Sequence, residues 1–93
     1  MSMDDNFTGI QHIGIPTNDI EATIAFYQKL GFIPVLRTVN EQANEKVAFL
    51  RLHNLTIETY ENKAAEMKTG AIDHIAINCV SIEDAFSYIN KEG

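Results

Sequence analysis

Apolar and polar residues alternate along residues 8–16, which is the pattern of a β-strand. A period of two places Ile13 and Ile15 on one face of this strand, and His12 and Gly14 on the other. We therefore expect the first strand to carry a histidine on the face opposite its two isoleucines.

The next segment has the period of an α-helix. Apolar residues recur at spacings of three and four, at Ile20, Ile24, Tyr27 and Leu30. Asn18 is the predicted N-cap, with Glu21 three residues later, and Gly31 marks the end of the helix. Phe26 and Tyr27 are expected to contribute to the core.

Three more strands are predicted, over residues 32–39, 46–53 and 55–61. Pro34 cannot donate a backbone hydrogen bond, which favours an edge position for the first of them. Residues 40–45 are a polar turn, and His53 with Asn54 forms the turn of a hairpin.

The last of these strands carries an acidic residue among apolar and hydroxyl side chains. Glu58 shares a face with Thr56 and Tyr60, while Ile57 and Thr59 share the other. A buried carboxylate without a partner is unfavourable, so Glu58 either faces solvent or has a partner. Glu61 falls on the opposite face and is expected to be solvated.

The start of the chain is repeated at its end. Residues 9–31 align with residues 71–93 at an offset of 62, with eight of twenty-three pairs identical, whereas unrelated segments match at roughly one or two. The second copy predicts a strand over residues 71–79 carrying His74, a cap at Ser81 and another amphipathic helix.

These elements predict an α+β fold with a mixed sheet. A βαβββ module spans residues 1–61, a connector spans residues 62–70, and residues 71–93 form an incomplete second module with the order βα. The helix of the partial module has the apolar residues Ile82, Phe86 and Ile89.

Charge and composition narrow the class of protein. Thirteen acidic and seven basic residues give a net charge of −6, which disfavours nucleic acid and anionic membranes as partners. There is no apolar run of membrane-spanning length and no basic, apolar leader at the start, so we expect a cytoplasmic protein. The single cysteine, Cys79, is expected to be a small buried hydrophobe.

Two histidines and one glutamate are candidate metal ligands. A single strand histidine is more often a packed residue, but His12 and His74 occupy equivalent places in the repeat, and Glu58 adds a carboxylate. Imidazole and carboxylate suit a divalent zinc, nickel, cobalt, manganese or iron ion, and three such ligands leave positions open for substrate. His53, at its turn, is expected to be exposed.

The chain resembles the vicinal oxygen chelate superfamily, which includes glyoxalase I, bleomycin-resistance proteins, extradiol dioxygenases and methylmalonyl-CoA epimerase. The resemblance is carried by residues 12–32, 47–52, 56–61 and 73–86. It implies paired βαβββ modules that form a cup around a metal, held here by His12, Glu58 and His74. The fourth ligand of the family would lie on a strand after Gly93.

The resemblance implies three alternative functions. The first is lactoylglutathione lyase-like chemistry, in which a metal-dependent lyase or isomerase acts on a small carbonyl or thiol-adduct substrate and Glu58 moves the proton. The second is methylmalonyl-CoA epimerase-like isomerisation with Glu41 as the base, although the favoured interpretation of Glu41 is an exposed turn residue. The third is binding of a small molecule without chemistry.

A homodimer is also expected. The strand over residues 71–79 would lack its neighbours, and the apolar face with Phe86 and Ile89 would lack cover. A second copy would supply both, for example by exchanging these elements.

Overall fold

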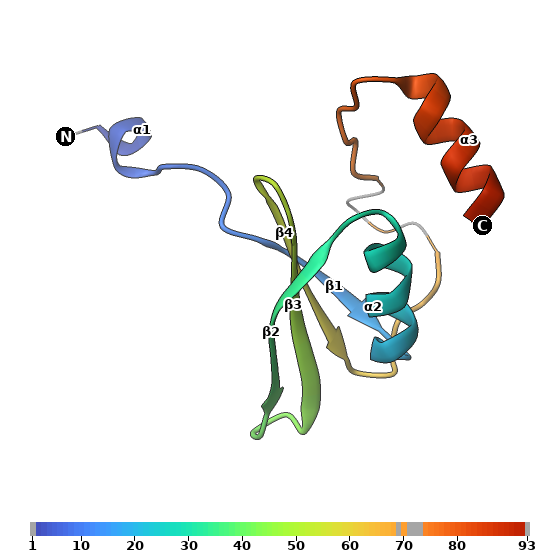
Figure 1. The fold of residues 1–93 in the computed structure, drawn as a ribbon. Coiled ribbons are helices and arrows are strands. Elements are labelled where there is room, and N and C mark those ends of the chain that lie inside the picture. Colours follow the sequence, from blue (N-terminus) through green and yellow to red (C-terminus); the bar gives the residue numbers. More distant parts are fainter. Residues whose placement is uncertain (1, 69, 71–73, 93) are drawn as a thin grey trace.

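A computed structural model describes residues 2–68, 70 and 74–92 (Figure 1). In chain order the elements are α1 (Met3–Asn6), β1 (Ile13–Thr17), α2 (Ile20–Lys29), β2 (Ile33–Asn40), β3 (Glu45–Leu52), β4 (Leu55–Glu61) and α3 (Ile82–Glu92). Figure 1 shows α2 lying against the sheet, with α1 and α3 outside it. Among the helices described, none has the length and apolar character needed to cross a bilayer.

The four strands form a mixed sheet in the order β1-β4-β3-β2. β1 pairs with β4 in parallel, and the other two pairings are antiparallel. The α+β class and the βαβββ order are therefore confirmed. β2 is an edge strand, as Pro34 indicated, and its register shifts between Pro34 and Leu36.

The core lies between α2 and one face of the sheet. It is formed by side chains that the helical and strand periods bring together, namely Ile20, Ile24, Phe32, Ala48, Leu50 and Ile57. Because side chains alternate along a strand, burial of Ile57 turns Glu58 to the opposite face. The predicted assignment of faces on the first and last strands is confirmed.

One buried hydroxyl is unsatisfied within this core. Thr59 is fully buried, and its Oγ1 has no hydrogen-bond partner among the described residues. Thr59→Val keeps the shape and removes the desolvated hydroxyl, so we expect it to stabilise the fold by about 1 kcal/mol. Urea unfolding measures the difference.

The matched control is Thr17→Val on β1. The Thr17 Oγ1 accepts a hydrogen bond from Asp19 N at 3.1 Å and lies 2.7 Å from the Thr23 hydroxyl. Losing these contacts is expected to destabilise the fold by about 1 kcal/mol. Equal losses in the two variants would contradict the unsatisfied state of Thr59.

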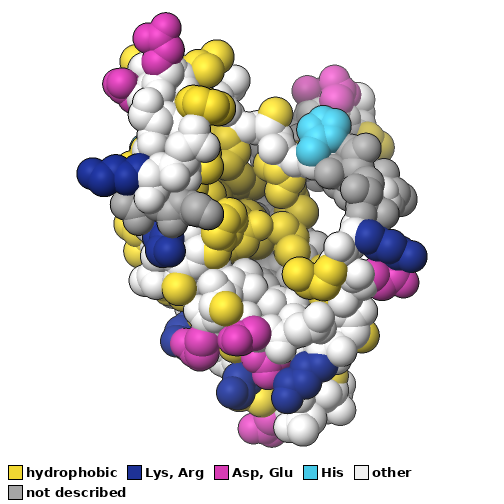
Figure 2. All heavy atoms as spheres, turned by 90° about the vertical axis from the view of Figure 1, so that its right-hand side faces the viewer, with side chains coloured by type: hydrophobic (Ala, Val, Ile, Leu, Met, Phe, Trp, Pro, Cys, Tyr) yellow, Lys and Arg dark blue, Asp and Glu magenta, His cyan; other side chains and the backbone are white. Residues whose placement is uncertain are grey.

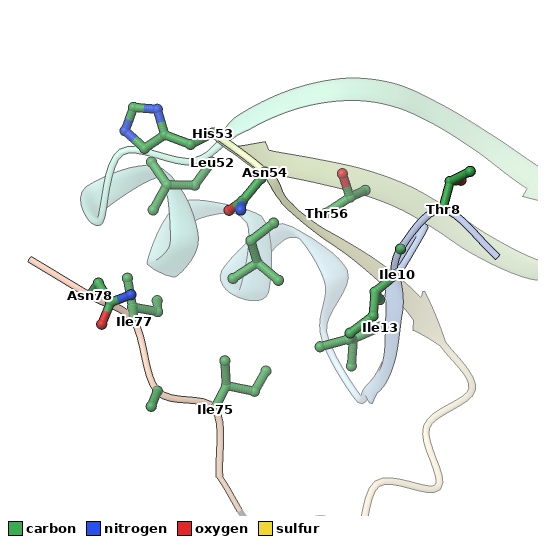
Figure 3. A pocket seen from close by; sticks show the side chains of 13 residues that line it. Thr8, Ile10, Ile13, Leu52, His53, Asn54, Thr56, Ile75, Ile77 and Asn78 are labelled. Atoms are coloured by element: carbon green, nitrogen blue, oxygen red, sulfur yellow. The ribbon is translucent and has the colours of Figure 1, made fainter. Parts of the chain in front are cut away.

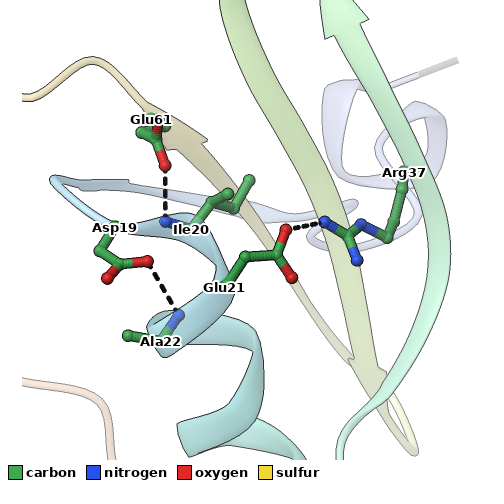
Figure 4. A network of polar contacts seen from close by, with 6 residues as sticks. All are labelled: Asp19, Ile20, Glu21, Ala22, Arg37 and Glu61. Atoms are coloured by element: carbon green, nitrogen blue, oxygen red, sulfur yellow. Dashed lines mark hydrogen bonds and ion pairs between the residues drawn. The ribbon is translucent and has the colours of Figure 1, made fainter.

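The start of α2 differs from the prediction (Figure 4). Asp19, not Asn18, is the N-cap, and its carboxylate accepts from Ala22 N at 3.1 Å. Asn18 instead bonds both the N–H and the carbonyl of Ala65 in the connector. Glu21 pairs with Arg37 across the surface of α2 and β2.

Glu61 is not solvated as expected. Its Oε2 accepts a hydrogen bond from Ile20 N at 2.8 Å, and the side chain is half-buried. The first N–H groups of a helix have no partner within it, and the positive end of the helix dipole favours a carboxylate there. The end of β4 therefore supplies part of the cap of α2 (Figure 4).

The first strand is shorter than predicted. β1 begins at Ile13, because its pairing with β4 begins with Ile13 opposite Ile57. Within the helix, Phe26 is exposed because it lies on the side of α2 away from the sheet, while Tyr27 is half-buried and burial raises its pKa.

The structure has no strand in residues 74–79, the described part of the predicted strand over residues 71–79. Residues 71–73 lie outside the described residues, and residues 74–79 form no strand because no neighbouring strand offers them hydrogen bonds. Cys79 is therefore exposed, not buried. In residues 62–68 and 70, the predicted connector, there is neither helix nor strand after β4 ends at Glu61.

The helix of the second copy forms as predicted. Asp84 N donates to the Ser81 Oγ at 3.1 Å, which confirms the cap. The Tyr88 hydroxyl donates to the carbonyl of Lys29 at the end of α2. The apolar side chains Ile82, Phe86 and Ile89 are more than half exposed, so this helix has an uncovered apolar face.

Candidate metal centre

Two of the predicted ligands meet on the sheet face opposite α2. His12 lies just before β1 and Glu58 lies in the middle of β4, on the neighbouring strand. The distance from His12 Nε2 to Glu58 Oε1 is 3.7 Å, and the two side chains are 31% and 29% exposed. The pair is sheltered by the protein and remains open on one side to a ligand.

The contact with Gln11 indicates which ring nitrogen of His12 carries the proton. His12 Nδ1 lies 2.9 Å from Gln11 Oε1, and since an amide oxygen only accepts, Nδ1 donates. A neutral ring then has its lone pair on Nε2, which faces Glu58. With the ring neutral, two acceptors 3.7 Å apart can share a cation, so this donor set fits two ligands of a divalent metal.

The ring of His12 is also held by packing. Phe49 on β3 lies opposite Glu58, and its ring meets the His12 ring edge-on at a centroid distance of 5.4 Å and an interplanar angle of 87°. This is a favourable geometry for two aromatic rings. Phe49 and Gln11 together leave His12 little freedom to turn away from Glu58.

Gly14 leaves room for the carboxylate. A Cβ at Gly14 would lie 3.5 Å from Tyr60 Cε1 and 3.7 Å from Glu58 Oε1. These are ordinary contacts, so Gly14→Ala should leave divalent metal affinity within about twofold. The branched side chain of Gly14→Val reaches further and would displace Glu58, which we expect to weaken metal binding by about tenfold or more.

Isothermal titration of the refolded, metal-free variants with Zn²⁺ or Mn²⁺ tests this expectation, with circular dichroism as the check of folding. Unchanged affinity in Gly14→Val would show that the Glu58 carboxylate does not need the space above β1.

His74, the third predicted ligand, is not brought to this pair, and the cavity that it lines has neither His12 nor Glu58 in its described lining. A cavity of about 1080 Å³ has His74, Ile75 and Ile77 on one side and residues of β1 and α2, including Gly14 and Tyr27, on the other. Seen from the side of α3, the surface is hollowed and lined by hydrophobic side chains (Figure 2). Among the described residues no three His, Cys, Asp or Glu side chains are grouped closely enough to hold a metal.

A second cavity of about 720 Å³ adjoins the first. Ile75, Ile77 and Asn78 lie across it from the β3–β4 turn and from the start of β1 (Figure 3). His53 is exposed at this turn with a φ of 52°, as its turn position predicted. Residues 75–78, which form no strand, therefore lie across this cavity from the start of β1, the edge strand.

Glu41 does not approach the His12 and Glu58 pair. It is exposed on the turn between β2 and β3. The register places Phe49 opposite Glu58, and Glu45, where β3 begins, lies four residues or about 13 Å along the strand. Glu41 lies beyond that point in the chain.

Three contributors to the site were not found from the sequence, namely Gln11, Gly14 and Phe49. Gln11 lies one residue before His12 and Gly14 lies two residues after it. Neither is a residue type that indicates a metal site. Gly14 had one available signal, since the equivalent residue in the repeat, Ala76, is also small.

Comparison with known proteins gives a family match and similar folds. A family model described as the Glyoxalase/Bleomycin resistance protein/Dioxygenase superfamily matches residues 9–93. Curated proteins give no significant match.

Solved structures give the same fold. The glyoxalase family protein from Enterococcus faecalis matches with a TM-score of 0.74 and 20% identity over 94% of this chain and 74% of that one. The genomically encoded fosfomycin resistance protein FosX from Listeria monocytogenes, complexed with Mn(II) and sulfate, matches with a TM-score of 0.76 and 21% identity over 92% and 72%.

Proposed function

Because the chain belongs to the glyoxalase, bleomycin resistance and dioxygenase superfamily, we propose that it is a metal-dependent lyase or isomerase. Its substrate would be a small carbonyl compound or thiol adduct, in the manner of lactoylglutathione lyase. The observation that carries the proposal is the convergence of His12 Nε2 and Glu58 Oε1 on the open sheet face. The Mn(II) complex of FosX supports a divalent metal.

Each residue of the site has its own proposed role. A bound divalent metal would act as a Lewis acid on a substrate oxygen. His12 and Glu58 would hold it, with Gln11 keeping the histidine in the right tautomer. The Glu58 carboxylate is also the base within reach of a substrate at this site, and its position favours it over Glu41 for moving a proton.

His74 would complete the site from a second copy of the chain. Its segment, residues 74–79, aligns with residues 12–17 in the repeat but forms no strand, and β1 lies at the edge of the sheet. Pairing of the two edges in a homodimer would satisfy their backbone groups and bring His74 toward His12. Light scattering that shows a monomer at micromolar concentration would contradict the dimer.

Turnover of the methylglyoxal and glutathione hemithioacetal, followed in metal-free protein with Ni²⁺, Zn²⁺ or Mn²⁺ added back, tests the activity. We expect turnover that requires the metal and disappears in Glu58→Gln. No turnover of this or other small α-hydroxycarbonyl adducts with any metal would exclude the lyase or isomerase proposal.

A second candidate is a binding protein of the bleomycin-resistance type, working in the cytoplasm on a small molecule. The observation that favours it is the apolar lining of the 1080 Å³ cavity, which could hold an organic compound without chemistry. Binding that raises the melting temperature in the absence of any metal would favour this function over the enzymatic one. An epimerase gains no support from the position of Glu41.

A further inference from the structure

One positive side chain lies on the same sheet face as the candidate metal centre. The four strands carry three cationic residues, Arg37, Lys46 and Arg51. The register places Arg37 opposite Ala48, on the α2 side, where it pairs with Glu21, and strand alternation places Lys46 on that side too. Arg51 is two residues from Phe49 and so shares the face of His12 and Glu58.

Arg51 lies within reach of this pair. It is opposite Thr56 on β4, while Phe49 is opposite Glu58, so Arg51 and Glu58 are diagonal neighbours with Cβ atoms about 7 Å apart. The guanidinium is exposed and takes part in none of the ion pairs found among the described residues. The Glu58 carboxylate is directed to His12 instead.

Arg51 is therefore a cation without an ion-pair partner among the described residues, in a chain with a net charge of −6. Guanidinium groups bind carboxylates and phosphonates through two parallel hydrogen bonds, and the bond is strongest where few other charges compete. The hydroxyl of Thr56, opposite Arg51, can add a donor to the same anion.

We propose that Arg51 is an anion-binding, specificity-determining residue, and that the substrate is a small acid. Its carboxylate or phosphonate would bind Arg51 while an oxygen two or three bonds away meets His12 and Glu58. This inference rests on the proposed function for the location of the reacting oxygen, but anion binding at Arg51 can be measured without metal.

The experiment uses the whole chain, freed of metal, and titrates it with methylphosphonate and with acetate by ¹H–¹⁵N NMR. The uncharged dimethyl ester of methylphosphonate is the control ligand. Arg51→Gln is compared with Arg37→Gln, an exposed arginine on the opposite face. We expect the dissociation constant for at least one anion to rise fivefold or more in Arg51→Gln and to change less than twofold in Arg37→Gln.

Arg51→Lys keeps the charge but loses the two-pronged geometry, so it should fall between the wild type and Arg51→Gln. The preferred probe separates a phosphonate from a carboxylate substrate. Equal binding in wild type and Arg51→Gln, equal binding of the neutral ester, or no binding of either anion would each overturn the proposal. Zn²⁺ content is measured on separate samples loaded with Zn²⁺. It should be unchanged in Arg51→Gln, and its absence from the loaded wild type would instead count against the metal centre.

Discussion

His12→Ala and Glu58→Ala are each expected to weaken divalent metal binding by about 100-fold or more. The two groups face each other at 3.7 Å, His12 just before β1 and Glu58 on the neighbouring β4, so either substitution removes half of the donor set. The remaining ligand would then hold the metal alone, which gives weak affinity. Metal analysis after dialysis against a defined free Zn²⁺ concentration measures the loss.

His53→Asn is the matched control, since it removes the third histidine of the chain at an exposed turn. Asparagine tolerates the positive φ of 52° at this position better than alanine. His74→Ala should reduce affinity in the assembled protein, where the proposed dimer forms. Metal content that is unchanged in both His12→Ala and Glu58→Ala would show that this pair is not the metal centre.

Most of the sheet could be predicted because the residues that build it repeat a simple period. The alternation through residues 55–61 predicted that Glu58 lies on the face opposite Ile57 and Thr59, but not which of the two faces is buried; the structure buries Ile57 and Thr59. The hairpin at His53 and Asn54 and the edge position of the strand with Pro34 followed from local chemistry.

Interactions between segments distant in sequence could not be read from periodicity. Glu61 has the pattern of a solvated strand end, yet the arrival of α2 beside β4 gives its carboxylate the N–H of Ile20. The N-cap was recoverable, because the repeat aligns Asp19 with Ser81, and both are the caps observed. Asn18 is an equally good capping residue, and only its contact with Ala65 explains why it does not cap.

The candidate site was predictable in part for the same reason. His12 and Glu58 come together through strand alternation and the parallel pairing of β1 with β4. The placement of His74 depends on whether residues 74–79 find a strand partner, which no local pattern specifies. Contributions of Gln11 and Gly14 depend on the rotamers of their neighbours, so residue type alone gives no signal for them.

Leu50→Ala is expected to destabilise the fold by about 3 kcal/mol. Leu50 is fully buried on β3 between α2 and the sheet, and alanine would leave a cavity that the surrounding strands cannot fill. In a domain of this size that loss lowers the melting temperature by roughly 12–24 °C. Thermal unfolding followed by circular dichroism, at one fixed protein concentration, measures it.

The same truncation at Leu36 on β2 is the control, because that side chain is 52% exposed. It should cost less than about 1 kcal/mol.

The contrast between Leu50→Ala and Leu36→Ala also tests how the core positions the site. Burial of Leu50 and its cross-strand partner Ile57 keeps β4 in register, so a weakened core should loosen the position of Glu58 and lower metal affinity with it. Equal destabilisation by Leu50→Ala and Leu36→Ala would mean that this core does not determine which face Glu58 occupies.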